Sequence, residues 1–364
     1  MLLLASLTVF VQLDRQTLID PGLTRFVPEP FRYDALLMQV AHDEQGQDLQ
    51  AQTRSLLSKR PVISEAVSAF AVARIQAGDL QAGVDALTVA ASRGWRDPTV
   101  QVAMANFALE ANEDGIAADR LSALWKTQTT GPQAYALTKV LLDRPDGRKL
   151  LTSRLTSGKY GMDDFALWGA RILPPQAIVQ TFRIARAKGY AFDCADLAET
   201  ARNFALLGEL ARGEAVWSGA CAQPGTPKKT SDAFVFDQGA GPLDWSYPGQ
   251  GGLTREFQTD GSGPILHYRN QDAIKRLLAQ RLVALAPGSH AVRLDMGDAQ
   301  GLRPRKLLVR MICLVPGKGA SSVQEIDPAL GQDTFDIPAK GCPAQRIDVL
   351  VGSGEGDVRA IRFS

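Results

Sequence analysis

The stretch RIQAGDLQAGVDALTVA, from Arg74 to Ala90, decides the fold of the first half of the chain. Helix formers with apolar residues at helical spacing lie on both sides of its Gly78-Asp79 turn, which predicts two antiparallel helices. The later stretch FALLGELARGEAVWSGA, from Phe204 to Ala220, overlays it with a turn at Gly208-Glu209. The chain therefore uses one helix-turn-helix unit at two widely separated places.

A regular repeat connects the turns of the first half. Asn112-Glu113 and then Asp146-Gly147 follow Gly78-Asp79, and the steps from 78 to 112 and from 112 to 146 are both 34 residues. In the same register, one position of the second helix is taken by Leu87, Leu121 and Leu155. This period resembles the tetratricopeptide family of helix-turn-helix repeats over roughly residues 33–222. The resemblance implies an α-solenoid, because a single hairpin cannot bury its apolar face alone.

The pattern of the sequence changes from helical to strand-like after residue 232. Short β-prone runs alternate with Gly, Pro, Asp and Ser turns, at 234–236, 253–259, 264–269, 277–285, 290–296, 306–315, 334–337, 346–351 and 358–363. In one of them Leu307, Val309 and Met311 alternate with Lys306 and Arg310. About eight or nine such strands without intervening helices predict an antiparallel β-sandwich or jelly roll. The missing βαβ rhythm argues against a nucleotide-binding α/β domain.

Two segments of this half carry a second resemblance. They are LDWSYPGQGG, from Leu243 to Gly252, and AQRLVALAPGSHAVRLDM, from Ala279 to Met296. In order and spacing they are similar to galactose-binding-like sandwiches, which serve as carbohydrate-binding modules, and the similarity covers about residues 233–364. It implies a glycan site in this half, although sandwiches of this shape also bind protein or nothing.

The segment CAQPGTPKKTSD, from Cys221 to Asp232, has the composition of a linker. We therefore expect an apolar lead-in at 1–31, a helical repeat domain at 32–222, a linker at 223–232 and a sandwich at 233–364. The two halves are expected to fold independently of each other.

The first thirteen residues, MLLLASLTVFVQL, are as apolar as the core of a secretory signal. They are too few for a helix that crosses a bilayer, which needs about twenty. We expect a signal remnant or an inner-membrane anchor here, and the alternative is a buried first helix.

The four cysteines divide evenly between the halves. Cys194 lies 14 residues before Gly208 (208 minus 194) and Cys221 lies 13 after it (221 minus 208), so the two face each other near the open end of a helical hairpin. Cys313 and Cys342 would close a loop in the second half. Two disulfides of this kind predict an oxidising compartment and hence a periplasmic or exported protein. The alternative is four unrelated buried thiols.

The charge of the chain narrows the class of partner. Forty basic residues stand against 39 acidic ones, which leaves a formal charge of +1 and argues against nucleic acid. We expect an envelope or secretion-machinery protein to bind the solenoid and a polysaccharide to bind the sandwich.

The candidate ligand-binding residues are side chains that stack on sugars or hydrogen-bond to them, namely Trp245, Tyr247, Arg255, His267, Tyr268 and Asn270. For Trp245 the alternative is a core anchor. The best constellation for an enzyme is Asp244, Asp260, Asp295 and His267, in which Asp244 and Asp260 would act as paired carboxylates on a glycan. The chain has neither a G-x-S-x-G nor an H-E-x-x-H motif. We therefore expect a non-catalytic accessory protein of envelope or exopolysaccharide handling, without cofactor or metal. A protein scaffold without glycan binding and a glycan-active enzyme remain the alternatives.

Overall fold

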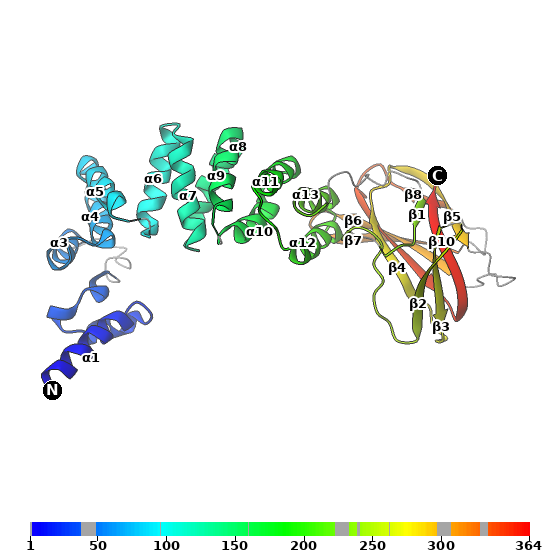
Figure 1. The fold of residues 1–364 in the computed structure, drawn as a ribbon, viewed down its shortest axis with the longest axis horizontal. Coiled ribbons are helices and arrows are strands. Elements are labelled where there is room, and N and C mark those ends of the chain that lie inside the picture. Colours follow the sequence, from blue (N-terminus) through cyan, green and yellow to red (C-terminus); the bar gives the residue numbers. More distant parts are fainter. Residues whose placement is uncertain are drawn as a thin grey trace. The chain divides into compact units, whose positions relative to one another are not determined.

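The computed structural model describes residues 2–37, 49–94, 96–158, 160–222, 233–238, 241–261, 263–296, 307–327 and 334–364 (Figure 1). Its contacts divide the chain into two compact units, Met1–Met162 and Asp163–Ser364. The predicted fold class is confirmed, since helical hairpins occupy the N-terminal part and antiparallel sheets the C-terminal part.

The first unit is helical. Its elements are α1 (Leu2–Gln16), η1 (Pro21–Phe26), η2 (Glu29–Phe31), α3 (Leu49–Lys59), α4 (Ser64–Gln76), α5 (Leu80–Arg93), α6 (Pro98–Glu110), α7 (Asp114–Lys126), α8 (Pro132–Asp143) and α9 (Pro145–Thr156). The leucines at the predicted repeat position, Leu87, Leu121 and Leu155, are all buried. Consecutive hairpins contact one another, which buries the face that each would otherwise expose.

The turns of the first two hairpins follow from their residue types. Gly78 and Asn112 both have positive φ, 83° and 59°, a conformation that glycine adopts freely and asparagine tolerates. The third turn is displaced from its predicted place at Asp146-Gly147. Pro145 begins α9 and holds Arg144 extended, so Asp146 and Gly147 lie inside the helix.

The second unit joins four helices to the sandwich. The helices are α10 (Met162–Ile172), α11 (Pro175–Ala187), α12 (Cys194–Leu206) and α13 (Leu210–Ala220). The strands are β1 (Ala233–Val235), β2 (Leu253–Asp260), β3 (Gly263–Asn270), β4 (Arg276–Val283), β5 (Gly288–Met296), β6 (Leu307–Val315), β7 (Gly319–Ile326), β8 (Thr334–Ile337), β9 (Ala344–Val351) and β10 (Gly354–Phe363).

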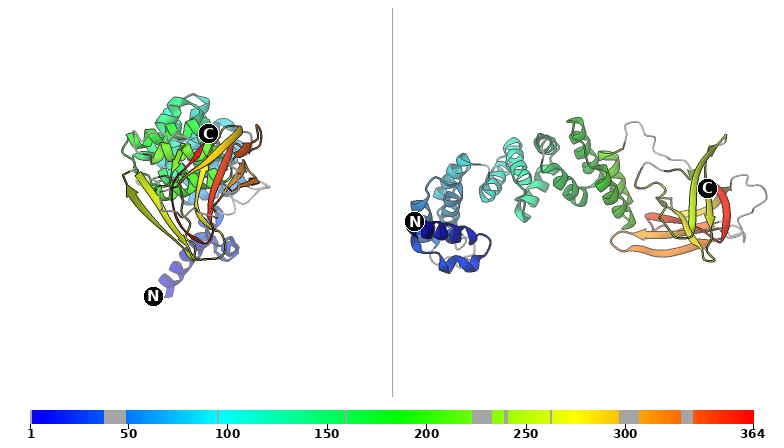
Figure 2. Two further views of the ribbon diagram at one scale, coloured as in Figure 1. Left: turned by 90° about the vertical axis from the view of Figure 1, so that its right-hand side faces the viewer. Right: turned by 60° about the horizontal axis from the view of Figure 1, so that its bottom comes forward.

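The strands form two antiparallel sheets that pack face to face (Figure 2). One sheet has the order β2-β3-β10-β5-β8, with β1 also on β10, and the other has the order β4-β9-β6-β7. The core between them is built from alternate residues of each strand, such as Leu266, Ile347 and Val349. The sequence reading missed β7, because GASSVQEI is a mostly exposed edge strand of low apolar content.

The α12–α13 hairpin covers the outer face of the four-stranded sheet. Ala205 and Leu210 pack there on sheet residues that point away from the sandwich core, namely Leu282, Ile312, Leu314 and Ala344. At the tip of the hairpin Gly208 has a φ of 83°, and an added Cβ would lie 2.6 Å from the carbonyl carbon of Val315. The tip therefore meets the sheet backbone at a distance that only glycine permits.

This packing bears on the expected domain boundary. The division between compact units falls after Met162, so α12 and α13 belong to the same unit as the sandwich. The predicted linker, 223–232, lies outside the described residues. Independent folding of the two halves stays a prediction, and the sandwich fragment 233–364 would have to fold with the face around Ile312 uncovered.

Both predicted disulfides are present. Cys194 bonds to Cys221 with their Cα atoms 5.7 Å apart, and Cys313 bonds to Cys342 with theirs 5.0 Å apart. The first closes the open end of the α12–α13 hairpin, and the second lies buried in the sandwich core. Two disulfides fit an oxidising, exported compartment. Within the described part of the chain, no helix has the length and apolar character needed to cross a membrane.

Candidate functional site

A cavity of about 470 Å³ lies inside the second unit, between α12 and the loop that leads into β2. We call it the α12 cavity. Its polar and aromatic groups come from Glu199, Arg202, Asp244, Ser246, Tyr247 and Gln280. Two of these, Asp244 and Tyr247, were candidate residues in the sequence, and the structure brings them to the same recess.

The helical wall of the cavity depends on the register of α12. Asp193 caps this helix by accepting hydrogen bonds from the backbone N–H groups of Ala195 (2.9 Å) and Asp196 (3.4 Å). Leu197, Ala201 and Ala205 form the buried face of the helix. Glu199 and Arg202 are not part of that face, and both line the cavity.

Arg202 connects the helix to the sandwich loop. Its guanidinium donates to the carbonyl oxygen of Pro242 (3.2 Å) and to the hydroxyl of Ser246 (2.8 Å). Burial, followed by the nearby charge of Arg346, lowers the pKa of Arg202. The two acceptors of Arg202 are neutral, so its positive charge is not compensated by them. Hydrogen bonds from a charged, partly desolvated guanidinium to a ligand oxygen are stronger than the same bonds in bulk water.

A partly buried ion pair between Asp244 and Arg281 fixes the opposite wall. Asp244 accepts from Arg281 (2.9 Å) through one carboxylate oxygen and from the backbone N–H of Gly241 (3.1 Å) through the other. Burial lowers the pKa of Arg281, and the carboxylate of Asp244 opposes that shift. Next to the pair, Ser246 and Gln280 exchange two backbone hydrogen bonds of 2.9 Å. The loop is therefore held on the edge of β4 before any ligand arrives.

Tyr247, in this loop, and Arg255, on β2, are partly buried neighbours. The Tyr247 hydroxyl donates to the carbonyl oxygen of Asp237 (2.6 Å), and its ring meets Phe257 edge-on. Burial, with the Asp237 carboxylate second, raises the pKa of Tyr247 well above its usual value, so the phenol stays protonated. Arg255 donates to the carbonyl oxygens of Tyr247, Pro248 and Leu277, at 3.2, 2.6 and 3.0 Å. Of the two residues, only Tyr247 lines the cavity.

Three of the candidate ligand residues lie in the sandwich core. Trp245 is 4% exposed, and its ring stacks on that of Phe236 with the ring centroids 4.4 Å apart. This position corresponds to the alternative of a core anchor. Tyr268 is also in the core, where burial raises its pKa to about 12. Asn270 is buried and its amide donates to the carbonyl oxygens of Ile274 and Val351, both at 3.0 Å. In this conformation none of the three presents its side chain to a ligand.

His267 lies elsewhere, on the outer face of the six-stranded sheet. Its Nδ1 is 2.6 Å from the Asp357 carboxylate, directly across the strand pair of β3 and β10. The alternation of β3 explains this position, because Leu266 and Tyr268 on either side of His267 point into the core. The structure therefore separates His267 from the α12 cavity.

The candidate carboxylates of an enzyme are also dispersed. Asp244 is at the cavity, Asp260 at the end of β2 pairs with Arg359, and Asp295 on β5 lies 3.4 Å from Arg362 on β10. Each of the three carboxylates faces an arginine, and the three lie at separate places on the sandwich. Among the described residues no three His, Cys, Asp or Glu side chains are grouped as a metal site would require.

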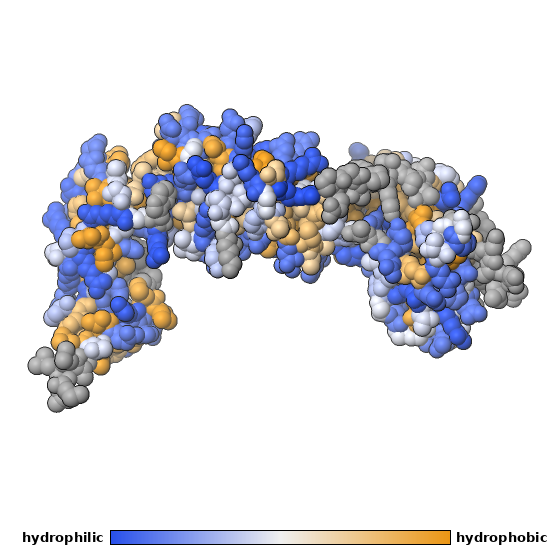
Figure 3. All heavy atoms as spheres, viewed as in Figure 1, coloured by the Kyte–Doolittle hydropathy of each residue, from blue (hydrophilic) through white to orange (hydrophobic). Residues whose placement is uncertain are grey.

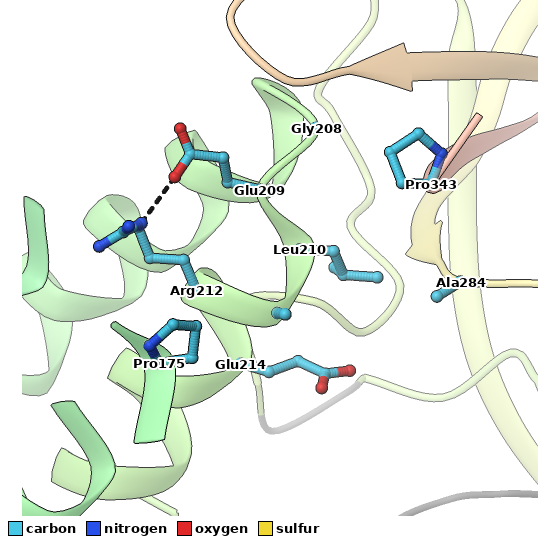
Figure 4. Close-up of a pocket in the computed structure, with 9 residues that line it drawn as sticks. Pro175, Gly208, Glu209, Leu210, Arg212, Glu214, Ala284 and Pro343 are labelled. Carbon is cyan, nitrogen blue, oxygen red and sulfur yellow. Dashed lines mark hydrogen bonds and ion pairs between the residues drawn. The ribbon is translucent and has the colours of Figure 1, made fainter. Parts of the chain in front are cut away.

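A second recess, of about 330 Å³, lies beside the tip of the α12–α13 hairpin (Figure 4). Figure 4 shows Leu210 on the side that faces Ala284 and Pro343 of the sandwich. Its one guanidinium, from Arg212, is bonded to Glu209 (2.6 Å) and to the carbonyl oxygens of Ala170 and Leu173. This recess offers an apolar wall with few available hydrogen-bonding groups, so the α12 cavity is the better candidate for a polar ligand.

Sequence reasoning missed the residues that α12 contributes to the site. Glu199 and Arg202 belong to the helical repeats, whereas the ligand was expected in the sandwich. No pattern in the sequence singled out Glu199 or Arg202 from the other polar residues of the helical repeats. The packing of this helix on a β-sheet is a tertiary contact that the periodicity of a single sequence does not encode.

Comparisons with known proteins add little to this geometry. No family model and no curated protein matches the sequence. Among solved structures, a chain of a glycosylation associate protein complex from Streptococcus agalactiae is similar over 33% of this chain and 43% of that one. The identity is 12% and the TM-score 0.25, and a likeness this weak carries no argument. The resemblances to tetratricopeptide repeats and to galactose-binding-like sandwiches stay predictions.

Proposed function

We propose that this protein is an exported, non-catalytic accessory factor of envelope or exopolysaccharide handling, and that its α12 cavity binds a short stretch of neutral glycan. The observation that carries the proposal is the lining of that cavity. A guanidinium, two carboxylates, a hydroxyl and an amide line it together with the Tyr247 ring. Several hydrogen-bonding groups next to one aromatic side chain are the usual means of holding a sugar.

The charges around the cavity favour a neutral ligand. Arg202 and Glu199 carry opposite charges, and Asp244 is neutralised by Arg281. A strongly anionic polymer would gain little attraction from such a balanced site. Because stacking and neutral hydrogen bonds each contribute modestly, we expect a dissociation constant on the order of micromolar to millimolar.

The hydrogen bonds that Asp244 already makes support binding rather than catalysis. Two carboxylates line the cavity, those of Glu199 and Asp244, and both oxygens of Asp244 already accept hydrogen bonds. A glycan-active enzyme would be recognised by release of reducing ends that Asp244→Asn abolishes.

Titration calorimetry with neutral oligosaccharides on the full chain tests the glycan site. Glu199→Gln and Gln280→Ala should each weaken binding by about 2- to 10-fold, the value of one hydrogen bond. Asp196→Asn, an exposed change on the same helix, is the matched control and should bind as the unaltered chain does. No heat with any neutral oligosaccharide, or equal weakening in the control, would contradict the proposal.

The rival function is a protein scaffold without glycan binding, and the stacked hairpins of the first unit favour it. Helical repeats of this kind offer extended surfaces to peptide or protein segments. Under this alternative an envelope or secretion-machinery protein would bind the full chain, with an affinity that Glu199→Gln leaves unchanged. Capture of such a partner together with silent calorimetry would select the scaffold.

A further inference from the structure

The N-terminal part of the first unit exposes an unusual concentration of apolar side chains. Six large ones are exposed between residues 7 and 26, against eleven in all the rest of the described chain. The six are Leu7, Val9, Val11, Leu18, Ile19 and Phe26. Figure 3 shows hydrophobic residues at the surface in the region that Figure 1 labels α1. Single exposed apolar residues need no explanation, whereas a cluster does.

The helix that carries this cluster is anchored to the fold at its C-terminal end. Asp14 is buried, and its carboxylate accepts hydrogen bonds from the backbone N–H groups of Tyr33, Asp34 and Ala35, at 2.9–3.2 Å. The ring of Phe10 stacks on Phe31 at 5.4 Å. These contacts fix which side of α1 faces the protein, and the other side is left uncovered.

The uncovered side has the pattern of an interfacial helix. Leu7, Val11 and Arg15 follow one another at intervals of four residues, and Leu18 comes three further on. Such spacing places them along one side of the helix. The turns after Gln16 continue in helical hydrogen bonds as far as Asp20, so Leu18 and Ile19 extend the same stripe.

Cationic groups border the apolar stripe. Arg15 is exposed within it, and the guanidinium of Arg25 lies 4.7 Å from the ring centroid of the exposed Phe26. Of the nearby acidic groups, Asp14 is buried in backbone hydrogen bonds, and Asp20 is exposed and accepts from the backbone N–H of Gly22. Apolar side chains flanked by arginines match the boundary between acyl chains and anionic head groups.

We propose that α1 and η1 bind the surface of an anionic lipid bilayer, with Leu7, Val11, Leu18, Ile19 and Phe26 inserted at the interface. In this proposal the 15 residues of α1 lie along the membrane surface, with their exposed apolar side chains at the boundary between head groups and acyl chains. Arg15 and Arg25 select anionic over zwitterionic lipid. The proposal extends the envelope location proposed above and is independent of glycan binding.

Flotation of the full chain with vesicles tests it, with zwitterionic lipid alone or with anionic lipid added. The unaltered chain should float with the anionic vesicles. Leu18→Asp combined with Ile19→Asp should lower the constant for partition onto the vesicles about tenfold or more, because two apolar side chains are lost from the interface. Arg15→Gln combined with Arg25→Gln should weaken binding to anionic vesicles only.

The control replaces two equally exposed apolar residues elsewhere in the first unit, Val62→Asp with Leu80→Asp. It should float as the unaltered chain does. Failure to float with either vesicle, or an equal loss in the control, would overturn the proposal. Lipid-free self-association that Leu18→Asp and Ile19→Asp abolish, without vesicle binding, would assign the stripe to a second copy of the chain. Calorimetry with oligosaccharides is unaffected by any of these outcomes, so the two proposals fail separately.

Discussion

The two outer faces of the β-sandwich differ, and the difference shows how the helical part and the sandwich form one unit. The outer face of the four-stranded sheet is apolar around Ile312 and Leu314, and the α12–α13 hairpin covers it. The outer face of the six-stranded sheet carries polar pairs such as His267 with Asp357 and Asp295 with Arg362. One outer face packs against the helical hairpin and the other is polar and exposed. The sandwich therefore shares part of its packing with the helices.

The two disulfides give the largest expected effects. Each closes a loop of similar length, with sequence separations of 27 and 29, so the chain-entropy contribution should be about 3–4 kcal/mol for either. They differ in access, because Cys313 and Cys342 are buried while Cys194 and Cys221 are partly exposed. Mild reductant should therefore open Cys194–Cys221 first, as followed by alkylation and mass mapping. Simultaneous opening would show that the hairpin and the sandwich core are equally accessible.

Truncation of the covered face comes next. Ile312→Ala should lower the free energy of unfolding by about 2–4 kcal/mol, because it leaves a cavity under the hairpin. Val323→Ala, on the exposed edge strand β7, is the matched control and should cost less than about 0.5 kcal/mol. Urea denaturation measures both. Similar small losses would mean that the hairpin does not rest on Ile312.

The hairpin tip permits a comparison of two glycines with nearly equal backbone angles. Gly208 and Gly189 have φ values of 83° and 84°, but an added Cβ meets the Val315–Pro316 backbone only at Gly208. Gly189→Ala therefore measures the cost of the left-handed conformation alone, about 1 kcal/mol. Gly208→Ala should cost about 1–3 kcal/mol more, since the sheet must shift. Equal melting temperatures for the two variants would refute the close contact.

The charged face should be the least sensitive. Arg362→Gln removes an exposed partner of Asp295, and we expect a loss below about 0.5 kcal/mol. Raising the salt concentration should reduce even that difference. A loss comparable to that of Ile312→Ala would show that this face also has a structural partner.

The sequence predicted the repeats and the strands because local periodicity determines both. The three leucines of the repeat register, the turns at Gly78 and Asn112 and both cysteine pairs were all predictable from spacing. The displaced third turn was not, because Pro145 overrides the 34-residue period.

The covered face was present in the sequence but was read incompletely. β6 was interpreted as an alternating strand with Arg310 on its outer side. Ile312 and Leu314 lie on that same side, so the run LLVRMICLV is apolar on both faces and predicts cover on both. The identity of the cover could not be predicted, because it depends on tertiary contact between segments that differ in period.

The candidate site was harder to predict for the same reason. Trp245, Tyr268 and Asn270 have the right chemistry for a sugar, yet the alternation of β3 and the stacking on Phe236 place them in the core. The residues that complete the α12 cavity come from a helix, and only the docking of that helix brings Arg202 to Ser246.

Native-state hydrogen exchange on the full chain tests the central claim most directly. If α12, α13 and the four-stranded sheet form one cooperative unit, the amides of α12 and α13 should open with the same free energy as those of β6 and β9. Gly208→Ala should lower both values together. Exchange of the hairpin at a much lower free energy, with β6 and β9 unaffected by Gly208→Ala, would contradict the account.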